Sequence, residues 1–351
     1  MGLCFGEKYD KINKLLVEWR DFLNYIGSKL SLIDFIVGSI EQVAGNNTGI
    51  FADLFAGTGI VGSTFKQKGF NVIANDIQHY SYVLNKHFIE NAETVGCSLV
   101  DYLNNLDGIS GFVYQNYCAG SGSNRNYFTD INGRKCDAIR TEIESLYKTG
   151  KISENQYYYL LASLINSIDK YANTASVYGA FLKHIKKSAA KDFSLNLLPI
   201  IAGTPGIVYN IDANNLIPRI AGDILYLDPP YNARQYCANY HVLESISRYD
   251  NPVLSGKTGL RDYNEQKSKY CSAKTVANAF DDLLSKARFK YVFLSYNNEG
   301  LMSFDTIQKI MSKYGKYEMF EKDHHRFRAD KEESRRHKAS RTTEYLHCLI
   351  K

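Results

Sequence analysis

The chain has 351 residues, of which 44% are hydrophobic and 23% are charged, and its formal net charge is +5 at pH 7. No apolar run approaches the roughly 18 to 20 residues that a membrane helix needs, and residues 1–8 lack the basic and apolar regions of a signal peptide. The seven cysteines are scattered and include no Cys-x-x-Cys pair, which argues against structural zinc and against a disulfide framework. We therefore expect a cytoplasmic protein that does not bind a membrane and holds no metal.

The first predicted elements alternate between helices and strands. Apolar residues at helical spacing predict helices over residues 12–23 and 30–40, on either side of a break at Tyr25-Ile-Gly-Ser-Lys29. The pattern then predicts, in order, a strand over 49–55, a helix over 60–68, a strand over 71–74 and a helix over 80–91. This alternation is typical of a parallel α/β sheet.

The middle of the chain has a different texture. Residues 110–135 are rich in Gly, Asn, Ser and Tyr and show no helical period, which resumes at 139–147 and 157–168. Strand patterns return at 206–210, 223–227, 291–294 and 344–350. The interruption predicts one catalytic domain made of residues 1–105 and 206–351, with residues 106–205 as an inserted, mainly helical region.

The most informative segment is Asp228-Pro229-Pro230-Tyr231, which follows the apolar run 224–227. A short apolar run that ends in a carboxylate is typical of a buried parallel strand, which brings the acid to the edge where open α/β folds place their chemistry. The two prolines fix φ and disfavour a helix, so Asp228 and Tyr231 are predicted to lie on a stiff turn. One carboxylate and one aromatic face suit an amino group on a flat heterocycle, as in a nucleobase pocket.

A glycine-rich turn is predicted between the first strand and the helix after it. Its residues Phe55-Ala56-Gly57-Thr58-Gly59 leave backbone N–H groups free at a helix start, where a ligand can approach closely. Asp76 follows the second strand, at the position where an acid binds ribose hydroxyls in such folds. With Gly62 the spacing also fits a dinucleotide-binding oxidoreductase, but Asp228-Pro-Pro-Tyr231 has no role in hydride transfer. We therefore favour an adenosyl cofactor that donates a methyl group.

Three motifs occur in the order Tyr25-x-Gly27-x-Lys29, Phe55-x-Gly57-x-Gly59 and Asp228-Pro-Pro-Tyr231, and together they span most of the chain. In this respect the chain resembles the DNA adenine N6-methyltransferases of the D12 class, the group that includes the bacterial Dam enzymes. The resemblance implies a Rossmann-like α/β sheet that binds S-adenosylmethionine, needs no metal and carries an inserted target-recognition region. It implies that the following residues bind the cofactor: Tyr25, Gly27, Lys29, Phe55, Ala56, Gly57, Thr58, Gly59, Asp76 and Asp212. For Asp212, capping of the following turn is the alternative.

The target base is predicted to meet Asp228, Pro229, Pro230 and Tyr231. Hydrogen bonds from the adenine amino group to the Asp228 carboxylate and to the Pro229 carbonyl would favour the tetrahedral geometry in which nitrogen attacks a methyl group. Because N6 is paired inside duplex DNA, the base must leave the stack, and Tyr231 is the expected stacking partner. His241 is expected to be structural, and residues 295–299 are expected to brace the pocket from behind.

DNA contacts are predicted in the insertion and in the loop after Tyr231. Asn124 and Arg125 have the donors and acceptors that read base edges, whereas Lys183, Lys186 and Lys187 would contact phosphates. For each of these residues an ordinary solvated loop or helix face is the alternative. Further candidates are Arg234 in the loop and a second basic cluster made of Arg326, Arg328, Arg335, Arg336, Lys338 and Arg341.

The sequence therefore predicts a site-specific enzyme that methylates N6 of a flipped adenine in double-stranded DNA. We expect a monomer from a restriction-modification system, whose cognate endonuclease acts on the same site without forming a stable complex with it. Because similar four-residue signatures occur in enzymes that methylate RNA bases or glutamine side chains, an RNA or protein methyltransferase is the alternative. A non-catalytic nucleotide-binding module is less consistent with an intact Asp-Pro-Pro-Tyr.

Overall fold

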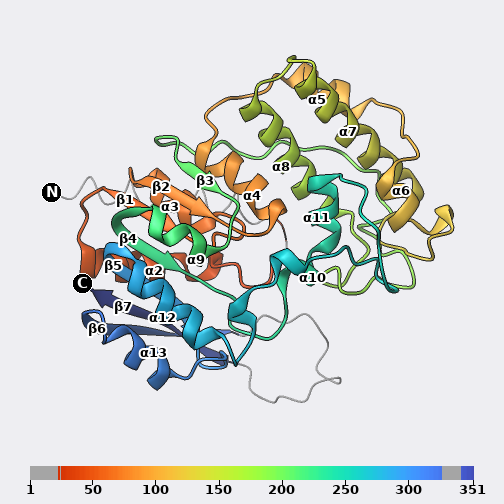
Figure 1. The fold of residues 1–351 in the computed structure, drawn as a ribbon. Coiled ribbons are helices and arrows are strands. Elements are labelled where there is room, and N and C mark those ends of the chain that lie inside the picture. Colours follow the sequence, from red (N-terminus) through yellow and green to blue (C-terminus); the bar gives the residue numbers. More distant parts are fainter. Residues whose placement is uncertain (1–22, 24, 326–340) are drawn as a thin grey trace.

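Leu23, residues 25–325 and residues 341–351 are described by a computed structural model of the chain. At the centre of this part of the chain lies a seven-stranded sheet with the order β3-β2-β1-β4-β5-β7-β6 (Figure 1). Paired strands from β3 to β5 are parallel, whereas β7 is antiparallel to both of its neighbours. The predicted Rossmann-like α/β class is confirmed. The strands are β1 (Ile50–Asp53), β2 (Asn71–Asn75), β3 (Ile207–Tyr209), β4 (Ala221–Leu227), β5 (Arg288–Asn297), β6 (Lys316–His325) and β7 (Arg341–Ile350).

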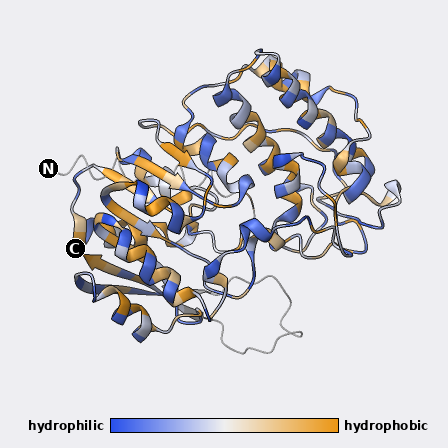
Figure 2. Ribbon diagram, in the orientation of Figure 1, coloured by the Kyte–Doolittle hydropathy of each residue, from blue (hydrophilic) through white to orange (hydrophobic). Residues whose placement is uncertain are grey.

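The sheet separates two hydrophobic cores, because successive side chains on a strand point to opposite faces. Phe51 and Tyr226 are buried on one face, whereas Ala52 and Leu225 are buried on the other. Strands that are buried on both faces appear as apolar ribbons between helices whose outer sides are polar (Figure 2). The first core includes α2 (Ile33–Ala44), α3 (Ile60–Gln67) and α4 (His79–Asn85), and the second includes α9 (Ala213–Leu216), α12 (Val276–Lys286) and α13 (Phe304–Met311).

Three acids from distant parts of the sequence meet at one edge of the sheet. Asp53, the last residue of β1, lies opposite Ala74 of β2 and Tyr226 of β4. Asp76 and Asp228 follow directly after the ends of β2 and β4. Because parallel strands align their carboxyl ends, this edge is where chemistry is expected in an open α/β sheet.

A group of helices lies beside the sheet, at the upper right of Figure 1. Thr129 caps the start of α7, and Ser153 caps α8 through a capping box. Helix α11 comes from the C-terminal part of the chain but packs here, because Arg140 of α7 donates hydrogen bonds to the carbonyls of Ile246 and Ser247. These helices are α5 (Cys97–Asn104), α6 (Phe112–Tyr117), α7 (Asp130–Lys148), α8 (Glu154–Lys170) and α11 (His241–Arg248).

The short elements mostly join the larger ones and shape the loops near the active edge. They are η2 (Leu30–Leu32), η3 (Lys86–Glu90), η4 (Ala119–Ser121), η5 (Ile217–Arg219), α10 (Tyr236–Asn239), η6 (Asn264–Gln266) and η7 (Lys269–Cys271). Among the described residues, no helix is both long and apolar enough to cross a membrane.

Two stretches differ from the sequence prediction. Residues 110–135 are more regular than expected, because they contain α6 and the start of α7. Strand β6 was not predicted. It lies at the edge of the sheet, and its sequence mixes charged residues with apolar ones instead of forming an apolar run. The predicted helix over 12–23, apart from Leu23, lies outside the described residues, as do Arg326 to Lys338 of the second basic cluster and the side chain of Arg341. The division into residues 1–105, 106–205 and 206–351 stays a prediction.

Candidate active site

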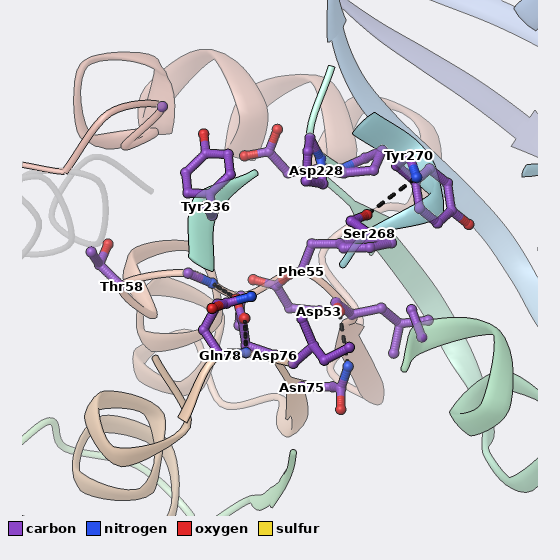
Figure 3. Close-up of a pocket in the computed structure, with 18 of the residues that line it drawn as sticks. Asp53, Phe55, Thr58, Asn75, Asp76, Gln78, Asp228, Tyr236, Ser268 and Tyr270 are labelled. Atoms are coloured by element: carbon purple, nitrogen blue, oxygen red, sulfur yellow. Dashed lines mark hydrogen bonds between the residues drawn. The ribbon is translucent and has the colours of Figure 1, made fainter. Parts of the chain in front are cut away.

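A pocket opens at the carboxyl edge of the sheet (Figure 3). Its walls come from the turns after β1, β2 and β4, from the segment Tyr25-Ile-Gly-Ser-Lys29, and from residues 266–270. All three motifs of the sequence therefore line one cavity. The wall made by Gln266, Ser268 and Tyr270 had no motif to reveal it.

The turn after β1 has the conformation that its glycines predict. Gly57 has φ +51° and Gly59 has φ +84°, which residues with a Cβ atom rarely adopt. A Cβ atom on Gly57 would lie 3.2 Å from the Tyr25 ring. The Gly57 N–H donates a hydrogen bond of 2.9 Å to Asp76 Oδ2, which fixes the turn to the end of β2. Phe55, Ala56 and Thr58 line the pocket beside these glycines.

Asp76 is a half-buried carboxylate held by two backbone donors. Besides the bond from Gly57, its Oδ1 accepts a hydrogen bond of 2.8 Å from the Gln78 N–H (Figure 3). Burial raises the pKa of Asp76 to about 6, although both hydrogen bonds oppose this shift. The predicted contact with ribose hydroxyls stays a prediction.

Two pocket acceptors have no hydrogen-bond partner. Asp53 Oδ1 and Gln78 Oε1 are both buried and unpaired, on side chains that are 1% and 4% exposed. Burial, together with the nearby carboxylates of Asp228 and Asp76, raises the pKa of Asp53 well above its usual value. Buried acceptors are nearly always paired in native proteins, so these atoms indicate a ligand with N–H or O–H donors. Neither residue was predicted from the sequence. The signal for Asp53 was its position at the end of a strand, which resembles the position of Asp228 directly after β4.

Asp228 forms a buried ion pair with Lys29. Lys29 Nζ lies 3.0 Å from Asp228 Oδ1, and the two side chains are 4% and 16% exposed. Burial raises the pKa of Asp228 to about 6, with Lys29 opposing the shift. Burial disfavours the charge on Lys29, but the interactions with Asp228, Tyr231, Glu344 and Tyr226 together outweigh burial and raise the Lys29 pKa well above its usual value. Lys29 was predicted to lie near the cofactor, and its partner in the described structure is the catalytic candidate.

Tyr231 is the last residue of the same turn. It lines the pocket together with Pro229 and Pro230. Its ring lies edge-on to Tyr296 at 5.9 Å between centroids, and its carbonyl accepts a hydrogen bond of 3.0 Å from the Leu301 N–H. These contacts support the turn from behind, at the strand end where the sequence predicted a brace. The Tyr231 ring is therefore fixed while one side of it faces the cavity.

Helix α10 holds the segment that contains Tyr25 and Lys29. The Tyr236 hydroxyl donates to the Ile26 carbonyl at 3.1 Å, and the Ile26 N–H donates to the Tyr240 hydroxyl at 2.8 Å. The Tyr25 ring stacks on Tyr240 at 4.8 Å between centroids. Gly27, at φ +84°, leaves room for the Tyr236 hydroxyl, which a Cβ atom would approach to 2.8 Å. Tyr236 at the start of α10 and Tyr240 directly after its end thus connect the first motif to the segment that follows Asp-Pro-Pro-Tyr.

Asp212 has the alternative role that the sequence allowed. Its carboxylate caps α9 by accepting a hydrogen bond of 3.2 Å from the Asn215 N–H. The residue also lines the pocket, so the predicted cofactor contact stays a prediction. His241 is buried and its Nε2 lies 3.0 Å from the Tyr178 carbonyl, which agrees with a structural role.

The predicted DNA-binding residues fall into two groups. Arg125 donates hydrogen bonds to the carbonyls of Asn116, Gly256 and Lys257, and Lys186 donates to the Thr174 carbonyl, so these side chains hold loops in place. Asn124 is exposed and has φ +58°. The remaining candidates have exposed side chains and are Lys183, Lys187 and Arg234.

The fold and the pocket define a class of protein: a Rossmann-like sheet whose carboxyl edge brings the three motifs expected of a methyltransferase to one cavity. Among the described residues, no group of three or more His, Cys, Asp or Glu side chains could hold a metal ion. The chain belongs to the family described as D12 class N6 adenine-specific DNA methyltransferase, which it matches over residues 25–336. It is therefore an adenine-specific DNA methyltransferase that uses S-adenosylmethionine.

Several type II methyltransferases are similar to this chain over most of its length. The chain is 53% identical over 334 residues to the type II methyltransferase M.NlaIII of Neisseria lactamica, covering 94% of this chain and 99% of that protein. It is 37% identical over 312 residues to M.CviAII of Paramecium bursaria Chlorella virus 1, covering 88% and 93% of the two chains. Identity to M.FokI of Planomicrobium okeanokoites is 38% over 345 residues, and there the chain spans 53% of the longer protein.

Proposed function

We propose that this pocket methylates N6 of an adenine that has left the DNA duplex, with Asp228 as the acceptor for the amino group. The observation that carries the assignment is the buried Asp228 carboxylate on a proline-stiffened turn, at the same edge as two unpaired acceptors of a cofactor pocket. The cofactor supplies a methyl group on a sulfonium, which is a good leaving group. The roles of this chain's own residues follow from their positions.

The acceptors of the pocket match the donors of S-adenosylmethionine. The cofactor carries N–H donors on its ammonium and its adenine, and O–H donors on its ribose. Asp53 Oδ1 and Gln78 Oε1 lack partners, and Asp76 keeps lone pairs beyond its two backbone bonds. Several carboxylates at one edge also favour a cationic ligand. We assign Asp53 and Gln78 to cofactor binding beside Tyr25, Asp76 and the glycine turn.

Asp228 orients and polarises the target amino group. With a pKa of about 6 it is mostly ionised at neutral pH, so it can accept an N6–H hydrogen bond. The bond strengthens as positive charge develops on nitrogen, which is the kind of interaction that accelerates a reaction. Tyr231 offers a fixed ring for the flipped base, and stacking of this kind contributes about 1–3 kcal/mol per base. That gain offsets part of the cost of unstacking.

DNA phosphates are proposed to meet Lys183 and Lys187. Asn126 donates hydrogen bonds to the carbonyls of Leu182 and Lys183, which fixes the exposed basic loop. Arg125, its neighbour in sequence, holds the loop that contains Lys257. One short segment therefore fixes two loops that carry exposed lysines, which suits backbone contacts to DNA better than base reading by Arg125 itself.

The enzyme is further proposed to belong to a restriction-modification pair and to act as a monomer. Support for the first point comes from the relatives, which are named type II methyltransferases. A methyltransferase can modify each strand separately, so it needs no second copy in its site. A cytoplasmic location is proposed as well, and the restriction-modification relatives support it.

The test is transfer of labelled methyl from S-adenosylmethionine to unmethylated duplex DNA, followed by nucleoside analysis. We expect N6-methyladenine with the native protein, and none with Asp228→Ala or Asp228→Asn that still binds the cofactor. An active Asp228→Asn variant would overturn the assignment of Asp228. Sequencing the methylated sites then identifies the target.

A further inference from the structure

Glu344 is a buried carboxylate at the active edge that no motif includes. It lies on β7 opposite Asn297, the last residue of β5. The residue is 5% exposed, and its Oε2 is buried without a hydrogen-bond partner. Glu344 interacts electrostatically with Lys29, Asp228 and Tyr231. It therefore belongs to the surroundings of the target-base pocket.

Backbone contacts fix β7 relative to the Asp-Pro-Pro-Tyr turn. The Asn298 N–H donates to the Thr343 carbonyl at 3.2 Å, at the residue before Glu344. The Leu301 N–H, a few residues later in the same loop, donates to the Tyr231 carbonyl at 3.0 Å. The position of the carboxylate is thus set by the same loop that supports the turn.

A buried carboxylate oxygen without a partner, such as Glu344 Oε2, is costly, because its desolvation is not repaid by a hydrogen bond. Lys29 interacts with both acids. Its Nζ is paired with Asp228 Oδ1 at 3.0 Å, and it is also attracted electrostatically by Glu344. An ammonium has three N–H donors, so it can exchange one carboxylate for another. The target amino group needs Asp228 as its acceptor, so it competes with Lys29 for that carboxylate.

We propose that Glu344 is a positioning residue that serves as the second counter-ion of Lys29 when the target base binds. This inference rests on the proposed role of Asp228. In the free enzyme Lys29 pairs with Asp228, and on base entry its ammonium turns toward Glu344, which keeps the buried cation paired. Two carboxylates against one ammonium leave the site with a net negative charge, which stabilises the positive charge that develops on N6.

Lys322 offers a purely structural explanation for Glu344. The two residues lie opposite each other on β6 and β7, so their side chains share one face of the sheet. Lys322 Nζ also lies 5.8 Å from the centroid of the Phe35 ring. If Glu344 only served Lys322, neutralising either residue would have the same effect on the enzyme. Within the part of the chain that the structure describes, the charged and titratable groups around Glu344 include Lys29, Asp228, Tyr231 and Lys322.

The experiment compares Glu344→Gln, which keeps the shape and removes the charge, with Glu344→Asp, which keeps the charge. We expect Glu344→Gln to lower kcat about tenfold to hundredfold, as a small misplacement at the reacting centre does, with little change in the Kd of S-adenosylmethionine. Glu344→Asp should retain more activity than Glu344→Gln. Lys322→Gln and Glu318→Gln, a β6 residue paired with Lys316, serve as controls and should behave like the native enzyme.

The pH profile separates a positioning role from a structural one. Burial and, to a smaller extent, the Glu344 carboxylate raise the pKa of Asp228, so removing that charge should move the acid limb of kcat/KM to lower pH. An unmoved limb, an unchanged kcat, or the same loss in Lys322→Gln would overturn the proposal. So would a Glu344→Asp enzyme less active than Glu344→Gln.

Asp228→Asn, measured in the same series, distinguishes this inference from the function it rests on. If Asp228→Asn is inactive and Glu344→Gln equals the native enzyme, the Glu344 proposal fails alone. If Asp228→Asn is active, the assigned role of Asp228 fails, and the Glu344 proposal fails with it. Thermal melting of each variant checks folding, and we expect Glu344→Gln to be no less stable, because it removes a buried charge whose Oε2 has no hydrogen-bond partner.

Discussion

Replacing Lys29 by Met should move the acid limb of the pH profile upward. Lys29 holds the Asp228 carboxylate in its ionised form, so its removal raises the pKa of Asp228 above about 6. The pH dependence of kcat/KM reports the pKa values of the essential groups of the free enzyme. The perturbation therefore predicts loss of activity at neutral pH that alkaline pH restores.

The magnitude follows from the distance of 3.0 Å between Lys29 Nζ and Asp228 Oδ1. Two unit charges at that separation attract by about 1.4 kcal/mol in water and about 5.5 kcal/mol at an effective dielectric constant of about 20. One pKa unit corresponds to about 1.4 kcal/mol, so even the lower value moves the limb by about one unit. At pH 7 the ionised fraction of Asp228 falls from about nine-tenths, for a pKa of about 6, to about half or less.

The assay measures methyl transfer to duplex DNA at subsaturating substrate, which gives kcat/KM, between about pH 5.5 and 9. Steps of about half a pH unit resolve the acid limb. Lys68→Met is the matched control, because Lys68 pairs with Glu41 at 2.6 Å outside the pocket. We expect Lys68→Met to keep the native profile. An acid limb at the same pH in Lys29→Met and the native enzyme would refute the reasoning, as would an equal loss at both ends of the range.

Three further outcomes are expected. Tyr231→Ala should weaken binding of target DNA by about 1–3 kcal/mol through lost stacking, whereas Tyr231→Phe should bind like the native enzyme in a titration with methyl-free duplex; equal loss in both would contradict stacking. Gln78→Leu should weaken S-adenosylmethionine binding by about 1 kcal/mol or more in calorimetry, and an unchanged Kd would mean that no cofactor donor meets Gln78 Oε1. Replacing Lys183 and Lys187 together by Gln should reduce the slope of log affinity against log salt by about 2, and an unchanged slope would place the phosphates elsewhere.

Much of the site was predictable because strand ends are a local signal. The apolar run before Asp228 predicted β4, and the shorter run before Asp76 predicted β2. Parallel pairing then required both acids to lie at one edge. Asp53 obeys the same rule. It was missed because the glycine turn that follows it was interpreted through its backbone N–H groups alone.

Partners that come from distant segments were not predictable in this way. Arg125 looked like a base reader, and only the fold brings the carbonyls of residues 116, 256 and 257 to its guanidinium. The hydroxyls of Tyr236 and Tyr240 meet Ile26 across more than two hundred positions of sequence. A side chain's role depends on what packs against it, and the local pattern does not contain that.

The sequence by itself determined the class of fold and the order of the three motifs, because hydrophobic period, proline stiffness and glycine turns act within a few residues. The reaction was implied by the family resemblance that these motifs carry. The tertiary structure decided which charges meet. It set Lys29 against Asp228, left Asp53 and Gln78 unpaired in the pocket, and buried Glu344 beside the same edge. Electrostatic interactions depend on distance and burial in space, so only the packed sheet and its loops could define them.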